Sequence, residues 1–426
     1  MSTPSLTGTI RRVATGTRNL DRPIALLGAM AFITQLGVSV MLPLLPLYAQ
    51  SLGATPFVLS LLVGGFAIAL AVGQLASGFL AERLASRRLV VAGMGVYAGA
   101  NVAIAGSATA IQLIAFRAIA GLGSGVNQVA ERLYLTQVAG RARLAFANSI
   151  LSAAGSAGSV LGPTVGGVLA AVGDLRAPFI VVGITSLAAA IGGLFLPAPT
   201  TRSQVGQGSA DPATPGGAIA EPAGGTIAGS AQATSGPRLL VVLFVVQLAF
   251  QATFGAFITT FAPFASERLA WSPAEIGLMF SLFGLGNVLL GPFLARQADR
   301  RGRRLFAIVG CALIFPFAFA YVAEAPRWIL YPITVLTGAG VTTLEASWYA
   351  LLSDATDGGR RGRAFGTVVA LSSLGIVIGS TLAAQLWERS GDVGLGLLVA
   401  AATVAVAGGA LLAHPSDRGG AVTTRP

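Results

Sequence analysis

The stretch GFLAERLASRR at residues 78–88 joins two long apolar segments through a short hydrophilic turn, and it is the key to the fold. A related stretch, ARQADRRGRR, lies at residues 295–304. An offset of 217 residues aligns the charged positions of the two: Glu82 with Asp299, Arg83 with Arg300 and Arg87 with Arg304. The same offset aligns glycines elsewhere, such as Gly121 with Gly338. Markers scattered along half the chain share one offset, which indicates an internal duplication.

The composition identifies the duplicated unit as a membrane-embedded one. The chain has 426 residues, of which 54% are hydrophobic and 10% charged, whereas soluble domains carry about 25% charged residues. All 27 basic residues are arginines, and most of them fall in short hydrophilic segments between apolar runs rather than along a face that could follow nucleic acid. Cys311 is the single cysteine and His414 the single histidine, which excludes a disulfide framework and a histidine or thiolate metal site.

Twelve apolar segments reach the length of about 20 residues that a spanning helix needs. The first six are expected at 24–49, 57–81, 89–107, 110–136, 144–172 and 178–196, and the second six at 239–265, 274–295, 305–323, 328–352, 364–387 and 393–413. A stretch rich in glycine, alanine, proline, serine and threonine separates the two sets and predicts a flexible linker. The expected domains are an N-terminal bundle (1–197), the linker (198–237), a C-terminal bundle (238–413) and a tail (414–426).

The arginines predict how the chain is oriented in the membrane. Six spans per unit is an even number, so both units enter the membrane in the same direction and form a parallel repeat. Twenty-one arginines lie in the termini, the linker and one set of turns, and four lie in the opposite turns. The excess marks the cytoplasmic side, so both termini are expected there. The use of arginine without lysine favours a GC-rich bacterial genome, and hence a bacterial plasma membrane.

Three charged residues stand out inside predicted spans, where a charge costs at least about 2.5–3.5 kcal/mol unless it has a partner or a water-filled cavity. Arg117 and Glu131 lie fourteen residues apart on the span 110–136, and Glu345 lies on the span 328–352. Trp348 and Tyr349 follow Glu345 by three and four residues, on the same helix face. A carboxylate beside aromatic rings suits a lipophilic cation or a proton. The alternative is a structural ion pair between helices.

The span 144–172 contains GSAGSVLGPTVGG, in which glycines recur every four residues. Gly158, Gly162 and Gly166 form a smooth face that allows close approach of another helix, and Pro163 is expected to bend the span. Gly284, Gly286 and Gly291 on the span 274–295 offer a partner surface. Ordinary close packing is the alternative explanation.

These features together resemble the major facilitator superfamily over the whole chain. The turn at 78–88 is similar to the family signature G-x-L-A-D-R-x-G-R-R. Its matching residues are Gly78, Leu80, Ala81 and Arg83, with Glu82 for the aspartate and Ala85 and Ser86 departing from the pattern. The later copy keeps Asp299, Arg300, Gly302, Arg303 and Arg304. Arg117 with Gly121 and Gly123 resembles the signature of the fourth span, whose arginine is implicated in proton coupling.

The string Gly158, Gly162, Pro163, Gly166 and Gly167 resembles the signature of proton-coupled antiporters. The resemblance therefore points to the drug:proton antiporter branch of twelve-span exporters. It implies an all-α membrane protein of two six-helix bundles around a cavity lined by the first, fourth, seventh and tenth spans. Those spans also supply Gln35, Gln128, Gln247 and Gln251.

The expected function is export of a lipophilic small molecule by alternating access in exchange for protons. Glu345 is the first candidate for binding substrate or proton, and Glu131 is the second. Arg117 would tune a protonation equilibrium, and the glycine-rich span would seal the cavity. The turns at 82–88 and 299–304 would lock the cytoplasmic side. A proton gradient replaces any cofactor, the expected partners are substrate, protons and lipid without nucleic acid, and the family resemblance implies a monomer.

Two other functions fit parts of the sequence. A uniporter or symporter of a sugar or other metabolite would have the same fold but would not need Glu345. A membrane sensor or scaffold would not transport at all, although the sequence shows no attached soluble domain. An enzyme is not expected, because the sequence shows no nucleotide-binding loop, metal-ligand cluster or nucleophile–base pair.

Overall fold

The computed structural model describes residues 22–197, 237–356, 368 and 371–413, and within these residues all regular structure is helical. The side chains of 140–145 are not described. The predicted tail (414–426) and most of the predicted linker (198–237) lie outside the described residues. Pro237, the last residue assigned to the linker, begins a helix.

The N-terminal half forms six helices whose bounds follow the predicted spans with two differences. They are α2 (Arg22–Met41), α3 (Leu45–Ser51), α4 (Pro56–Leu80), α5 (Ser86–Ala105), α6 (Ala110–Val172) and α7 (Ala177–Leu194). The first predicted span is broken between α2 and α3, where Pro43 and Pro46 supply no backbone N–H for a continuous helix.

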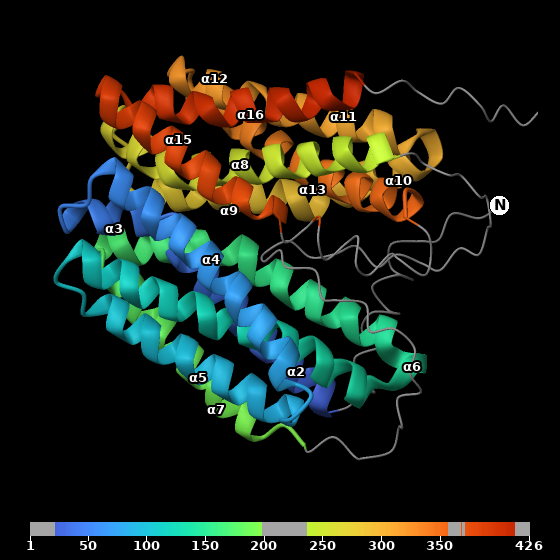
Figure 1. Ribbon diagram of the computed structural model, residues 1–426. Coiled ribbons are helices and arrows are strands. Elements are labelled where there is room, and N and C mark those ends of the chain that lie inside the picture. The colour runs from blue at the N-terminus through green and yellow to red at the C-terminus, as the bar shows by residue number, and fades with distance from the viewer. Residues whose placement is uncertain (1–21, 198–236, 357–367, 369–370, 414–426) are drawn as a thin grey trace, which may run out of the picture.

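The fourth and fifth predicted spans are joined in the single helix α6. Its 63 residues would extend about 95 Å if straight, three times the thickness of the bilayer core. Two stretches of α6, Ala110–Ala139 and Phe146–Val172, are each long and apolar enough to cross a membrane. Figure 1 shows that α6 reverses direction between them, so the backbone turns without leaving a helical conformation.

The C-terminal half repeats this arrangement with further breaks. Its helices are α8 (Pro237–Glu267), α9 (Pro273–Leu289), α10 (Gly291–Arg301), α11 (Arg303–Ile314), α12 (Pro316–Val322), α13 (Arg327–Asp354), α15 (Leu374–Ser390) and α16 (Val393–Ala413). The predicted spans 274–295 and 305–323 are each divided in two. Pro292 and Pro316 stand in the first turns of α10 and α12, and a proline interrupts the helical hydrogen bonds before it.

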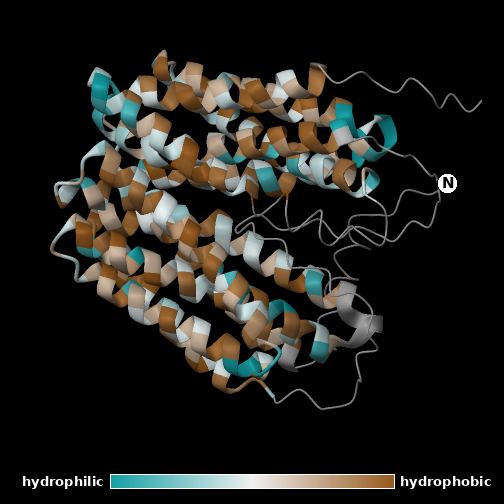
Figure 2. Cartoon of the chain, in the orientation of Figure 1, coloured by the Kyte–Doolittle hydropathy of each residue, from teal (hydrophilic) through white to brown (hydrophobic). Residues whose placement is uncertain are grey.

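Eleven helical stretches of the described chain are long and apolar enough to span a membrane. The predicted span 364–387 is the twelfth. Its described residues lie mostly in α15, which has 17 residues, and several of its first residues lie outside the described chain. Figure 2 shows apolar residues along the middle of the helices and polar residues concentrated toward their ends, as expected for membrane helices.

Equivalent contacts in the two halves support the duplication. A methyl group placed on Gly121 would lie 2.7 Å from the carbonyl oxygen of Phe66, and one on Gly338 would lie 2.0 Å from that of Phe283. Both members of the first contact are related to those of the second by the offset of 217 residues. Glycine is required at both positions because the neighbouring backbones approach so closely.

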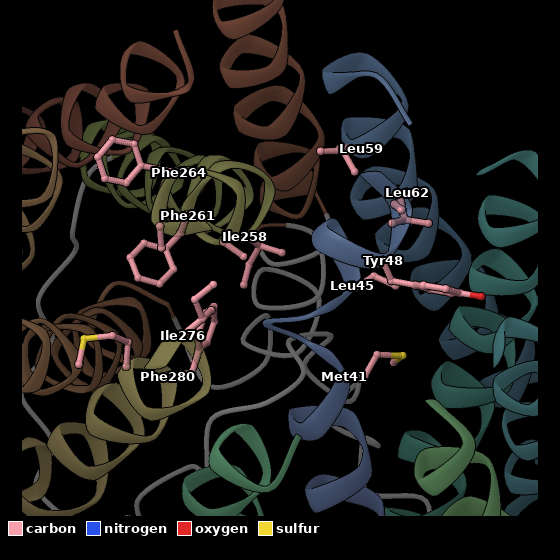
Figure 3. Packing of buried hydrophobic residues seen from close by; sticks show 14 of the residues in the cluster. Met41, Leu45, Tyr48, Leu59, Leu62, Ile258, Phe261, Phe264, Ile276 and Phe280 are labelled. Atoms are coloured by element: carbon pink, nitrogen blue, oxygen red, sulfur yellow. The ribbon is translucent and has the colours of Figure 1, made fainter. Parts of the chain in front are cut away.

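The two bundles share one hydrophobic cluster at a single end of the molecule. That cluster combines residues of the N-terminal half, among them Met41, Tyr48 and Leu62, with residues of the C-terminal half such as Ile258 and Phe261 (Figure 3). The other large clusters belong to one half each. Figure 1 shows the bundles closest at the end that carries α3 and diverging toward the other end. This conformation is therefore closed at the α3 end, which the arginine distribution predicts to lie outside.

Candidate functional site

Glu345 lies on the face of α13 that packs against α9 and α10. Gly338 and Thr342 share this face: Gly338 approaches the backbone of Phe283, and the hydroxyl of Thr342 donates to Oδ1 of Asn287 at 2.7 Å. Glu345 follows Thr342 by one helical turn and is partly exposed. Its carboxylate has no hydrogen bond or ion pair with any described residue. It is therefore an uncompensated acid inside a predicted span.

Trp348 is a core residue in this conformation, contrary to its predicted role in binding a ligand. Only 1% of it is exposed, and its indole N–H donates to the carbonyl oxygen of Leu243 on α8 at 2.7 Å. The three residues that separate it from Glu345 turn the helix by about 60°, which directs the indole toward α8 rather than along the carboxylate. Tyr349 is partly exposed, and its ring packs edge-on against Trp348 with the centroids 5.0 Å apart.

Gln128 on α6 occupies the position equivalent to Glu345 in the first half. Its Oε1 accepts a hydrogen bond of 3.0 Å from Nε2 of Gln74 on α4, and its own Nε2 donates to Ser124 at 3.4 Å. Gln74 was not among the residues predicted from the sequence to form the site. The signal that could have found it is its amide side chain inside a span, which needs a partner just as a charge does.

Glu131 lies one turn beyond Gln128 and is partly exposed. Nδ2 of Asn127 lies 3.5 Å from its Oε2, and no ion pair with a described residue involves it. The alternative of a structural ion pair therefore has no support in the described residues for either acid. Glu131 is equivalent to Trp348, so the two acids lie one helical turn apart in the repeat.

Arg117 is buried near the start of α6, away from both acids. Its exposed fraction is 4%, its guanidinium lies 4.0 Å from the centroid of the Phe66 ring, and its Nη1 lies 4.0 Å from Sδ of Met41. Its Nε has no hydrogen-bond partner among the described residues. Fourteen residues separate it from Glu131, about 21 Å along a straight helix. The structure therefore does not place Arg117 and Glu131 in one cluster.

The predicted glutamines differ in their surroundings. Nε2 of Gln35 donates weakly to Ser39 at 3.4 Å on the same helix. Gln247 is buried, with 4% of it exposed. Gln251 is partly exposed, and its Cβ lies 2.9 Å from the methyl position of Gly375, which fixes the spacing between α8 and α15. Gln35 and Gln251 remain candidates for contact with substrate.

The glycine face of the second stretch of α6 packs mainly on α2. Methyl groups on Gly158, Gly162 and Gly166 would lie 2.3 to 2.8 Å from α2 atoms. Gly167 and Pro163 instead approach α9, where a methyl group on Gly167 would lie 2.4 Å from the carbonyl oxygen of Pro273. The second stretch of α6 therefore packs on a helix of each bundle. Its glycines at 158, 162 and 166 contact α2, and Pro163 and Gly167 contact α9.

The predicted partner surface on the span 274–295 is only partly correct. Gly284 faces Val160 of α6, with a methyl distance of 3.4 Å. Gly286 and Gly291 face α13 instead, because Gly286 lies about 160° around the helix from Gly284 and Gly291 follows the break between α9 and α10. The polar link between these helices is a hydrogen bond of 2.7 Å from Thr164 to Ser281, which the sequence analysis did not identify.

The turns at 82–88 and 299–304 contact their own bundles in this conformation. Arg87 donates to the carbonyl oxygen of Leu194, and Arg304 donates to that of Leu411 at 2.9 Å, a pair of contacts related by the repeat. Arg303 bridges Asp299 at 3.4 Å and Asp354 at 2.5 Å. The remaining predicted gating residues, Gly78, Glu82, Arg83 and Arg300, are exposed at the surface. No hydrogen bond or ion pair between the bundles involves these turns among the described residues, so their locking role stays a prediction.

The N-terminal turn replaces the charged pair of the C-terminal turn with a neutral one. Ser86 and Gln137 are equivalent to Arg303 and Asp354, and they share a hydrogen bond of 2.6 Å. The departure of Ser86 from the signature arginine is therefore matched by a change in its partner. Both turns connect the same two helices of their bundles by different chemistry.

The whole chain matches the Major Facilitator Superfamily, over residues 27–262 and 242–425. It belongs to that superfamily. The tetracycline resistance protein, class C, of Escherichia coli is 26% identical over 331 residues, which cover 76% of this chain and 79% of that protein. MdtD of Salmonella paratyphi B, named for multidrug resistance, is 30% identical over 138 residues, 32% of this chain and 29% of that protein.

The structural comparison agrees on the major facilitator fold. The crystal structure of the nucleoside transporter NupG matches 93% of this chain and all of its own chain, with a TM-score of 0.73 and 13% identity. The fold of twelve membrane helices in two bundles and the resemblance to the drug:proton antiporter branch are thus confirmed. In this major facilitator protein, the unpaired carboxylate of Glu345 inside a span is the feature of the site that requires a chemical explanation.

Proposed function

We propose that the protein exports lipophilic small molecules across a bacterial plasma membrane in exchange for protons. It belongs to a family of transporters, and a relative over most of its length is named for resistance to tetracycline. The proposal includes cytoplasmic termini, a proton gradient as the only driving force, and action as a monomer.

The observation that carries the proposal is the unpaired carboxylate of Glu345. An acid at membrane depth without a partner is costly unless it exchanges protons or binds a cation during the work of the protein. The surroundings of Glu345 are partly exposed in a conformation that is closed at the α3 end. A carboxylate that is reached from one side and then from the other can alternate between a proton and a cationic substrate.

The experiment measures proton movement in reconstituted vesicles that contain a pH-sensitive dye. A proton gradient is imposed, and lipophilic cations and neutral antibiotics are then added to the wild type and to Glu345→Gln. We expect substrate-triggered proton flux in the wild type and its loss in the variant. Glu388→Gln on α15 is the matched control, because Glu388 is exposed and forms no ion pair with a described residue. Substrate movement without proton flux, unchanged in Glu345→Gln, would contradict the proposal and indicate a facilitator.

A further inference from the structure

The duplication provides an internal comparison for the surroundings of Glu345. The offset of 217 residues relates Gln128 to Glu345 and Gln74 to Gly291. In the first half the two related positions carry two amides that bind each other. In the second half they carry an acid and a residue without a side chain. The same backbone arrangement is thus neutral and paired on one side, and charged and unpaired on the other.

The amide pair of the first half has an unused acceptor. Nε2 of Gln74 donates to Gln128, but Oε1 of Gln74 is buried and has no hydrogen-bond partner among the described residues. Ser124 engages the amide nitrogen of Gln128. A buried acceptor without a donor is unfavourable, so this position suits a ligand that brings an N–H or O–H group.

The second half cannot supply Glu345 with an equivalent partner. A Cβ at Gly291 would lie 2.5 Å from Cβ of Thr342, so the side chain of Thr342 already occupies the space that a side chain there would need. The nearest amide on α9, Asn287, already accepts from Thr342 at 2.7 Å. The packing of α10 on α13 therefore prevents position 291 from carrying a side chain that could pair with Glu345.

We propose that Gln74 and Gln128 form the hydrogen-bonding half of a substrate site whose charged half is Glu345. The site selects an amphiphilic cation that carries a hydrogen-bond donor at the end opposite to its charge. Gln128 and Glu345 lie at equivalent heights on α6 and α13, related by the axis of the repeat, and both are partly exposed. A ligand that lies across this axis meets the carboxylate on one side and the acceptor Oε1 of Gln74 on the other.

This inference rests on the proposed function and adds Gln74 and the polarity of the substrate to it. A symmetric pair of acids would favour a dication, and a symmetric pair of amides would favour an uncharged polar molecule. The observed asymmetry favours a single positive charge with one donor group. Selection by a hydrogen-bond acceptor is stronger than selection by apolar shape, because a substrate without the donor leaves the acceptor unpaired.

The test compares two cations that differ in one hydroxyl group, tetraphenylphosphonium and its derivative with a hydroxyl on one phenyl ring. The measurement is the concentration of each that gives half-maximal proton flux in vesicles. We expect the wild type to favour the hydroxylated cation by about fivefold to tenfold. Gln74→Met and Gln128→Met keep the side-chain length but remove the amide, and both should bring the ratio close to one. Gln112→Met, near the outer end of α6, should keep the wild-type ratio.

Each outcome of the test is decisive. A ratio that stays at the wild-type value in Gln74→Met overturns the inference, while flux with both cations leaves the proposed function standing. A wild type that favours neither cation also overturns the inference alone. If the wild type gives no flux with either cation, the proposed function fails together with it.

Discussion

Replacement of Trp348 by phenylalanine separates a structural role from a binding role for this residue. The structure buries the indole in a cluster formed by α8, α11, α13 and α16 and links its N–H to the carbonyl oxygen of Leu243. Loss of the hydrogen bond costs about 0.5–1.5 kcal/mol. The smaller ring leaves space in a fully packed cluster, which costs about another 1 kcal/mol. We therefore expect Trp348→Phe to lower the free energy of unfolding by about 2 kcal/mol.

The assay uses Cys311, the single cysteine of the chain, which is buried in the same cluster with 5% of it exposed. A maleimide dye that becomes fluorescent on reaction with a thiol reports the temperature at which this cluster opens in detergent. Trp328→Phe is the matched control, because 74% of Trp328 is exposed and a surface change of this kind shifts stability by less than about 0.5 kcal/mol.

Trp348→Phe should keep the substrate preference of the wild type, since the indole does not contact the carboxylate side of α13. A variant that unfolds at the wild-type temperature but loses substrate-triggered proton flux would refute the structural assignment and restore Trp348 to the binding site.

Two further predictions concern packing and opening. Gly338→Ala should destabilise the protein by about 1–3 kcal/mol, because its methyl group would lie 2.0 Å from a carbonyl oxygen. Gly99→Ala should stabilise it by up to about 1 kcal/mol, since no described atom of a neighbouring element lies within 4 Å. Loss of helical circular dichroism on heating checks both signs, and equal effects would contradict the packing. Gln50 donates a hydrogen bond of 2.8 Å to Glu267 across the two bundles. Cysteines are placed at both positions in a Cys311→Ala background and joined by a short bismaleimide, and we expect this cross-link to abolish transport. Full transport after cross-linking would show that these ends do not separate.

Much of the fold was predictable because membrane insertion leaves a strong signal in the sequence. Apolar length fixed the number and positions of the spans, and the markers at 78–88 and 295–304 revealed the duplication. The breaks before α10 and α12 were not predicted, although Pro292 and Pro316 mark them. Apolar composition is insensitive to such breaks, since a kinked span is as hydrophobic as a straight one. The continuity of α6 was not predicted, because polar residues between two spans indicate a loop even where the chain stays helical.

The candidate site was predicted less completely, because charge at membrane depth is visible in a sequence but its surroundings are not. Glu345 and Arg117 were identified by the cost of burying them. Trp348 was misassigned because helical spacing places it near Glu345 without showing which helix lies beside it. Gln74 was missed because a single amide is an ordinary residue until its partner, Gln128, and its repeat counterpart, Gly291, are known.

The comparison of the two halves also indicates where function departs from the needs of the fold. Arg117 is equivalent to Thr334, whose hydroxyl pairs with that of Tyr321 at 2.8 Å and with the carbonyl oxygen of Leu330 at 2.8 Å. The fold therefore accommodates a neutral, fully satisfied residue at this position. A buried arginine without an acid among the described residues is less favourable, and the ring of Phe66 offsets only part of its cost. Arg117 and Glu345 are both charges that the repeat shows to be unnecessary for packing, so selection for transport is the simplest reason for both.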